Sequence, residues 1–232
     1  MPSRTTTRID PGGVAPTVLP FDWGAACAHL SAADPKLGEL IERVGAARLE
    51  LHRTQSPFES LVRSIVYQQL SGKAAATIHG RLAELFPDRR VRPELLLTHA
   101  DERLRAAGLS RGKVAALRDL ATRTLDGTVP RRDELGSMAD DEIVERLVRV
   151  RGIGRWTVEM LLIFGLGRPD VLPVHDLGVR HGFKLTYRKR SMPTAEELTR
   201  RGERWRPFRT VASWYMWRAV ELARRPRAAP DR

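Results

Sequence analysis

The 232-residue chain contains a single cysteine, Cys27. One thiol cannot form an intramolecular disulfide, and it cannot supply the ligands of a four-cysteine zinc site or an iron–sulfur cluster. The sequence also lacks an apolar run long enough to cross a membrane, and its N-terminus lacks the apolar segment of a secretion signal. We therefore expect a cytoplasmic protein with no iron–sulfur cluster and no membrane partner.

A second absence concerns β structure. No segment alternates apolar and polar residues with the β-branched enrichment of a strand, so the sequence predicts an all-α chain. Its length is sufficient for a real core, in one large domain or two small lobes. Residues 1–20 are polar, aperiodic and rich in Thr, Arg, Pro and Gly, which predicts a disordered leader. Residues 226–232 are expected to be a frayed tail, which leaves 21–225 as the folded part. Within it, local signals predict helix starts at Ser56-Pro57 and at Thr194, a loop over 129–139 and a last helix opened by Pro207.

Basic residues are in clear excess. Lys and Arg number 40 against 28 Asp and Glu, which gives a net charge of +12 and a pI near 10.9. Such a balance favours polyanionic partners and predicts salt-sensitive binding. An Arg-rich proteome from a GC-rich genome would produce the same excess, so the charge alone does not separate these two explanations.

The most informative stretch is 150–157, Val-Arg-Gly-Ile-Gly-Arg-Trp-Thr. An amphipathic helix is expected before it, with one buried stripe formed by Ile143, Val144, Leu147 and Val148. An apolar helix is expected after it, from Thr157 to about Leu166. The glycines allow a tight turn and a close approach of another molecule, and the following helix N-terminus favours an anion such as a DNA phosphate. A nucleotide-binding loop fits poorly, because a helix precedes it and the third Gly is missing.

A carboxylate follows at a defined distance. Asp176 ends a Pro-containing loop and stands at the start of another expected helix, where it would also serve as an ordinary N-cap. Asp170 is the rival carboxylate, but it lies before that loop, and we expect it to have a structural role such as a cap. His175 and His181 flank Asp176 without a third ligand at helical spacing, so no metal site is expected there.

This order of helix, Val-x-Gly-Ile-Gly, helix and Pro-containing loop ending in Asp resembles the helix-hairpin-helix-Gly/Pro-Asp (HhH-GPD) superfamily of DNA glycosylases. Gly152–Thr157 is most similar to the DNA-3-methyladenine glycosylase II (AlkA-type) branch. The resemblance extends from about Phe58 to Trp217, most of the chain. The family usually has Pro where this chain has Arg151, which is a mild departure at a solvent-side position.

The resemblance implies a fold and an activity. The fold would be all-α and two-lobed, with one lobe from about 58–165, a second from 21–57 plus 166–225, and no extra N-terminal β domain. The activity would be base excision: flipping an alkylated base such as 3-methyladenine out of double-stranded DNA and hydrolysing its N-glycosidic bond. The protein would act as a monomer at the nucleoid and would require no cofactor.

The resemblance also assigns residues to the chemistry. Asp176 matches the catalytic carboxylate, which stabilises the positive charge that develops at C1′ and can orient or deprotonate water. Trp156 stands where relatives that also cleave the backbone carry a Schiff-base Lys, which predicts a monofunctional enzyme without AP lyase activity. Trp156 and Trp217 match aromatic residues of the family's base pocket, and Tyr67 is a third candidate. Stacking and cation–π attraction to each ring would stabilise a bound methylated purine by about 0.5–2 kcal/mol. Four aromatics are at helical spacing, and at least two of them should instead lie in the core. The four are Trp156, Trp214, Tyr215 and Trp217.

Gln68 and Gln69 match the corner that enters the DNA, where a side chain fills the space left by the extruded base. Two polar residues at a helix C-terminus would also explain them without any wedge. The residues expected to hold the DNA backbone are Gly152, Ile153, Gly154, Arg155 and Thr157. Carbonyls near Gly152 and Gly154 would be the site of a monovalent cation, Na⁺ or K⁺.

Two alternatives to alkylbase excision stay open from the sequence. The same fold would serve for another base, such as an undamaged base in a mismatch or an oxidised purine. A catalytically silent protein that binds damaged DNA through the hairpin would show the same charge. Asp176 at the matching position, accompanied by aromatics, favours the enzyme.

Overall fold

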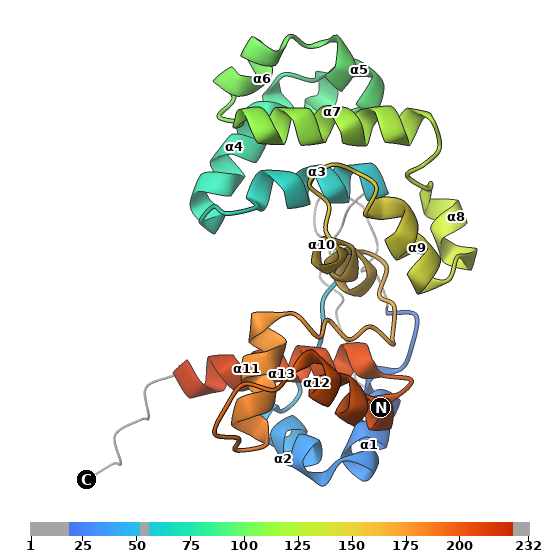
Figure 1. Ribbon diagram of the computed structural model, residues 1–232, viewed down its shortest axis with the longest axis vertical. Coiled ribbons are helices and arrows are strands. Elements are labelled where there is room, and N and C mark those ends of the chain that lie inside the picture. The colour runs from blue at the N-terminus through green and yellow to red at the C-terminus, as the bar shows by residue number, and fades with distance from the viewer. Residues whose placement is uncertain (1–18, 52–55, 225–232) are drawn as a thin grey trace, which may run out of the picture.

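The protein is described here by a computed structural model that covers residues 19–51 and 56–224. Nearly all of the expected leader (1–20) and the whole expected tail (226–232) lie outside these residues. The covered residues form helices and no strand, which confirms the all-α prediction (Figure 1). Within the same ranges, no helix is both long and apolar enough to cross a membrane.

The helices form two groups with one helix between them (Figure 1). The upper group consists of α3 (Pro57–Tyr67), α4 (Gly72–Glu84), η1 (Pro87–Arg89), α5 (Pro93–Thr98), α6 (Asp101–Ala106), α7 (Arg111–Leu125), α8 (Arg132–Ser137) and α9 (Asp140–Leu147). The lower group consists of α1 (Trp23–Ala33), α2 (Pro35–Val44), α11 (Leu177–Thr186), α12 (Ala195–Gly202), η3 (Glu203–Trp205) and α13 (Arg209–Arg224). Between them run α10 (Arg155–Met160) and its π-helical continuation η2 (Leu161–Gly165). One hydrophobic core connects both groups.

Helix α3 carries one wall of the candidate site, and local signals define its two ends. The Ser56 hydroxyl accepts a hydrogen bond from the Glu59 amide at 3.2 Å, and Pro57 opens the first turn, as the sequence predicts. At the other end, the Lys113 ammonium donates to the carbonyls of Val66 (2.7 Å) and Gln68 (2.9 Å). This lysine from α7 satisfies helix carbonyls that would otherwise lack a partner and thereby holds the corner after α3 in place.

In the lower group a buried carboxylate connects three elements. Asp34 is fully buried, and it accepts hydrogen bonds from the Tyr187 hydroxyl (2.5 Å), the Arg201 guanidinium (2.8 and 2.9 Å) and the Trp205 indole (3.1 Å). Burial opposes its charge, but these donors outweigh burial and lower the pKa of Asp34. The network fixes the turn between α1 and α2 against the segment from α11 to η3.

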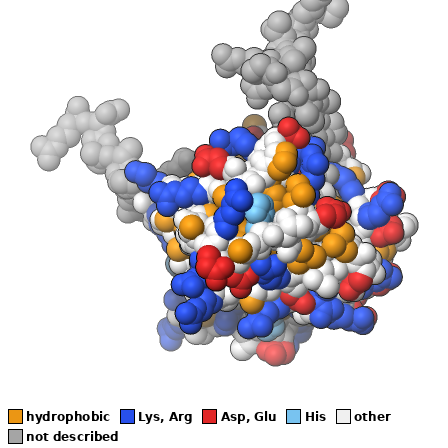
Figure 2. Space-filling view, turned by 90° about the horizontal axis from the view of Figure 1, so that it is seen from above, with side chains coloured by type: hydrophobic (Ala, Val, Ile, Leu, Met, Phe, Trp, Pro, Cys, Tyr) orange, Lys and Arg blue, Asp and Glu red, His pale blue; other side chains and the backbone are white. Residues whose placement is uncertain are grey.

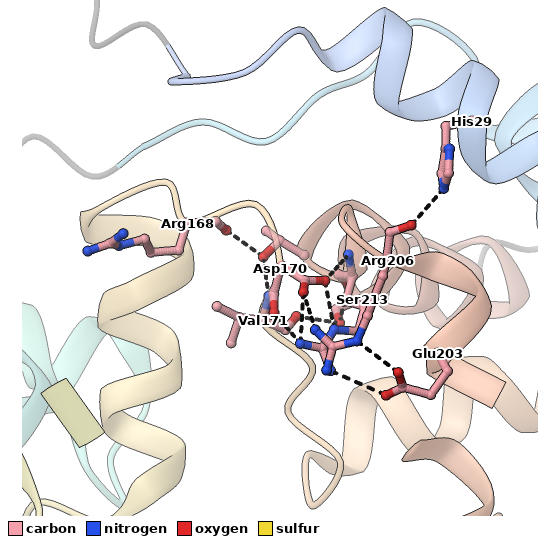
Figure 3. Close-up of polar contacts among 9 residues, drawn as sticks. His29, Arg168, Asp170, Val171, Glu203, Arg206 and Ser213 are labelled. Atoms are coloured by element: carbon pink, nitrogen blue, oxygen red, sulfur yellow. Dashed lines mark hydrogen bonds and ion pairs between the residues drawn. The ribbon is translucent and has the colours of Figure 1, made fainter. Parts of the chain in front are cut away.

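Asp170 has the structural role that the sequence favoured (Figure 3). Its carboxylate accepts from Arg206 (2.6 Å) and Arg209 (2.7 Å), and it accepts the Arg209 amide at 3.3 Å. Our prediction that Pro207 opens the last helix is therefore wrong: α13 begins at Arg209, where Asp170 provides the acceptor.

Three further expectations were wrong. The segment 129–139, expected as a loop, contains α8, a helix of six residues whose one buried anchor, Leu135, gives no periodic signal. Val148 was placed in the buried stripe but is 41% exposed, because the chain turns at this C-cap residue of α9. The helix after the hairpin begins at Arg155, two residues earlier than expected.

Candidate active site

The hairpin joins α9 to α10 by a tight turn. Ile143, Val144 and Leu147 bury the expected face of α9. Gly152 has a φ of +77°, a conformation that L side chains rarely adopt, and a Cβ there would lie 3.3 Å from the Ala116 Cβ. Gly154 then precedes α10 without a side-chain cap. The turn thus requires glycine at position 152, and it leaves the first amides of α10 without a capping side chain.

The two candidate wedge residues have different environments. The Gln68 side chain donates to the Gly152 carbonyl at 2.9 Å, so it joins the corner after α3 to the hairpin. Gln69 is exposed and has a φ of +58°, which is uncommon for a residue with a side chain. Of these two glutamines, Gln68 is the one whose side chain forms a hydrogen bond with the hairpin, within the part of the chain that the structure covers.

The carbonyls expected to hold a cation already accept hydrogen bonds. Gly152 accepts Gln68, and Gly154 accepts the amides of Thr157 (2.9 Å) and Val158 (3.3 Å). A cation near them would therefore share each oxygen with an existing bond. In the part of the chain that the structure covers, no three His, Cys, Asp or Glu side chains are grouped to hold a metal ion, and His175 and His181 form no such group.

Asp176 is the N-cap of α11 and is held by three donors from three helices. Its Oδ1 accepts the Val179 amide at 2.7 Å and the Trp217 indole N–H at 2.8 Å. Its Oδ2 accepts the Trp156 indole N–H at 2.7 Å. The orientation of the carboxylate is therefore set by α10, α11 and α13 together, and the cap and a catalytic use of the same group are compatible.

A cleft of about 490 Å³, large enough for a purine base, lies between α3 and the α10–η2 segment. Its lining residues are Ser60, Arg63, Ser64, Tyr67, Gln68, Gln69, Trp156, Thr157, Met160, Leu161 and Gly165. Trp217 is not among these residues, and it stacks on Phe164 with the ring centroids 5.6 Å apart. The structure thus brings Trp156, Tyr67 and both glutamines to the cleft, whereas Trp217 contacts Asp176 and is not among the residues that line it.

The aromatic residues of α13 are divided as the sequence suggested. Trp214 and Tyr215 are 5% and 1% exposed and belong to the core, which confirms that at least two of the four aromatics are structural. Trp156 is 50% exposed. Both Trp156 and Trp217 direct their indole N–H edges at Asp176, whereas the sequence interpretation considered only their ring faces.

Glu159 is a buried acid of α10 that the sequence reasoning missed. Its carboxylate accepts from Arg155 at 3.2 Å, and Arg155 also approaches Asp141 at 3.6 Å. Burial raises the pKa of Glu159 to about 7 against the opposing effect of Arg155, and the nearby charge of Asp176 adds to the rise. Arg155 is therefore engaged by acids of its own chain. An acid in an apolar helix, four residues after an Arg, was the available signal.

Gly178 is a second missed residue, and it permits the contact between Trp217 and Asp176. A Cβ at this position would lie 2.6 Å from Trp217 Cδ1, 2.9 Å from its Nε1 and 3.0 Å from Asp176 Oδ1. No side chain fits there without moving the indole or the carboxylate. Gly178 is thus the first residue to test if the position of Asp176 matters.

We expect Gly178→Ala to displace Trp217 from Asp176 and to slow any reaction that uses this carboxylate by about ten- to a hundredfold, since one positioned donor is lost. Gly136→Ala is the matched control, because a Cβ at Gly136 meets nothing within 4 Å. Rates under single-turnover conditions would be compared after thermal melts have shown both variants to be folded. Equal rates for the two variants would show that the contact with Trp217 has no catalytic role.

Comparisons with known proteins place this geometry in a family context. The family model for the HhH-GPD superfamily base excision DNA repair protein matches residues 62–207. DNA-3-methyladenine glycosylase 1 of Schizosaccharomyces pombe is 38% identical over 201 residues, covering 84% of this chain and 86% of the relative. An alkylbase DNA glycosidase-like protein of the same yeast is 31% identical, covering 88% and 97%.

Solved structures agree. The 3-methyladenine DNA glycosylase of S. pombe in complex with abasic DNA superimposes with a TM-score of 0.76 at 37% identity, covering 86% of this chain and 98% of that one. The DNA-3-methyladenine glycosidase of Bacillus halodurans gives a TM-score of 0.79 at 37% identity, covering 85% and 90%.

Proposed function

This chain belongs to the HhH-GPD superfamily of base excision DNA repair proteins, and from that premise we propose that it is a monofunctional DNA glycosylase for alkylated bases such as 3-methyladenine. The observation that carries the proposal is the carboxylate of Asp176, held by two indole N–H groups next to a cleft with room for a purine. We further propose that it acts on double-stranded DNA as a monomer, at the nucleoid of the cytoplasm.

The reaction follows from the position of that carboxylate. A base flipped into the cleft would lie against Trp156, whose N–H edge contacts Asp176. When the bond between C1′ and the base nitrogen breaks, the sugar develops positive charge, and the fixed carboxylate stabilises it. Water then adds to C1′ and gives its proton to Asp176. Trp156 cannot form a Schiff base, so the product is an abasic site in an intact strand.

DNA binding is assigned to the hairpin and to the corner after α3. The amides at the start of α10 face a phosphate, with Gly152, Ile153, Gly154, Arg155 and Thr157 forming the backbone-binding turn. Gln69 is the wedge that fills the space of the extruded base, because Gln68 is engaged by Gly152. A monovalent cation at the turn would be structural, and no other cofactor is required.

The face that carries α5, α6 and α7 shows no separate basic patch among the covered residues (Figure 2). On the face that carries α5, α6 and α7, basic and acidic side chains are mixed with hydrophobic ones (Figure 2). Arg118 of α7, for example, is paired with Asp101 of α6 on this side of the upper group. The hairpin and the cleft, not this face, are therefore the proposed contact with DNA.

The test is release of free methylated base from duplex DNA treated with a methylating agent, measured by chromatography. Strand integrity is followed on an end-labelled duplex with and without alkali. We expect base release, with strand scission only after alkali. Scission without alkali would contradict the monofunctional assignment. Binding without release across a panel that includes mismatched and oxidised bases would favour the silent damaged-DNA binder.

A further inference from the structure

The cleft carries one positive charge without a counter-charge in its lining. Arg63 lies one turn before Tyr67 on α3, and its guanidinium carbon is 4.1 Å from the centroid of the Tyr67 ring. Both side chains line the cleft. None of the residues that line it is an Asp or Glu. A planar cation thus lies on an aromatic face of the proposed base pocket, the kind of surface on which a cationic base would itself stack.

The one acid of α3, Glu59, does not form an ion pair with Arg63. Glu59, one turn earlier on the same helix, contacts Arg90 at 3.5 Å. Within residues 19–51 and 56–224, no acidic side chain forms an ion pair with Arg63. His79, whose ring lies 6.3 Å from Tyr67, adds no second charge: burial and then the charge of Arg63 lower its pKa. Among the residues that line the cleft, Arg63 is therefore the charged one that an incoming base would meet, whereas the carboxylate of Asp176 lies beyond Trp156 and faces the sugar.

Alkylated bases differ in how they respond to such a charge. A nucleotide of 7-methylguanine is a cation before cleavage, and when the C1′–N9 bond breaks, the electron pair passes to the base, which leaves neutral. A nucleotide of 1,N6-ethenoadenine is neutral, so the same step gives the leaving base a negative charge until solvent protonates it. In both cases the oxygen of water bonds to C1′ and its proton goes to Asp176. A fixed cation opposes entry of the first base into the cleft, and part of this cost persists in its transition state. The same cation stabilises the negative charge that the second base acquires in its transition state.

We propose that Arg63 is a specificity-determining residue that shifts excision away from positively charged alkylpurines and toward neutral alkylated bases. This inference rests on the glycosylase function proposed above and concerns the charge class of its substrate. At a partly solvated site, the Coulomb interaction between the guanidinium and a charge on a base a few ångströms away corresponds to about tenfold in rate.

The experiment compares single-turnover release of 7-methylguanine and of 1,N6-ethenoadenine from otherwise identical duplexes. Arg63→Gln is expected to raise the rate for 7-methylguanine and lower the rate for ethenoadenine, so that their ratio changes by at least about tenfold. Arg63→Lys keeps the charge and is expected to keep the ratio within about threefold. Arg200→Gln is the matched control, because it removes an exposed arginine from α12 and should leave the ratio unchanged. Arg63 is itself exposed, so its variants should melt near the wild-type temperature.

Other outcomes separate this inference from the proposed function. Equal slowing of both substrates by Arg63→Gln would assign Arg63 to a phosphate contact and overturn the charge selection. If the ratio changes as much in Arg63→Lys as in Arg63→Gln, the inference is also overturned, because the charge is then not what selects. A wild type that releases 7-methylguanine alone contradicts the role of Arg63 and leaves the glycosylase standing. A wild type that releases 3-methyladenine but neither of these two bases also overturns the role of Arg63 and leaves the glycosylase standing, whereas one that releases none of the three overturns both.

Discussion

Replacement of Asp176 by Asn is expected to slow base release by about a thousandfold or more, with the affinity for duplex DNA changed by only a few-fold. The substitution removes the negative charge that faces C1′ in the transition state, which is the interaction made only there. It also places an amide NH2 where the carboxylate now accepts the N–H groups of Trp156 and Trp217, so that one of these donors would face another donor. Single-turnover release and a binding titration on the same duplex would measure the two effects separately.

Asp170→Asn is the matched control for this variant. The same chemical change there weakens the contacts with Arg206 and Arg209, so it should lower the melting temperature without changing the rate per folded molecule. If Asp176→Asn released base at the wild-type rate while Asp170→Asn did not, the catalytic carboxylate would have been assigned to the wrong residue. If both were active, the proposed mechanism would fail altogether.

The features that sequence reasoning found are those with local causes. Ser56, Asp176 and Thr194 each cap a helix by accepting the amide three residues on, and each was recognisable from its neighbours alone. The buried stripe of α9 and the Gly-Ile-Gly turn are likewise set within about ten residues. Short helices such as α5 and α8 were not predicted, because six residues contain too few apolar positions to show a helical period.

The features that sequence reasoning missed depend on contacts between distant segments. Trp156 and Trp217 reach Asp176 across 20 and 41 residues, and nothing in the sequence says whether an indole presents its face or its N–H edge. The same holds for Gln68, which reaches the hairpin across 84 residues, and for Lys113, which reaches the end of α3. A residue match identified the participants, but only the packing of the helices shows which atoms meet.

Gly182→Ala is expected to cost more than about 3 kcal/mol of folding free energy and to lower the melting temperature by roughly 10 °C. A Cβ on Gly182 would lie 2.0 Å from the Met216 carbonyl oxygen and 2.7 Å from its Cα, so α11 and α13 would have to separate. The obstacle is backbone, which cannot rotate away as a side chain would. Because Asp176 caps the start of α11 and Trp217 lies on α13, the separation should also weaken their hydrogen bond in the molecules that still fold.

Gly80→Ala makes the same change within a helix but without an obstacle. A Cβ at Gly80 in α4 meets nothing within 4 Å, so alanine should be neutral or stabilise the protein by up to about 1 kcal/mol through its better helix propensity. Thermal and denaturant melts of the two variants should therefore move in opposite directions. Equal melting temperatures would mean that α11 and α13 do not approach as closely as the structure shows, and that the alignment of Trp217 with Asp176 is not enforced by glycine at this crossing.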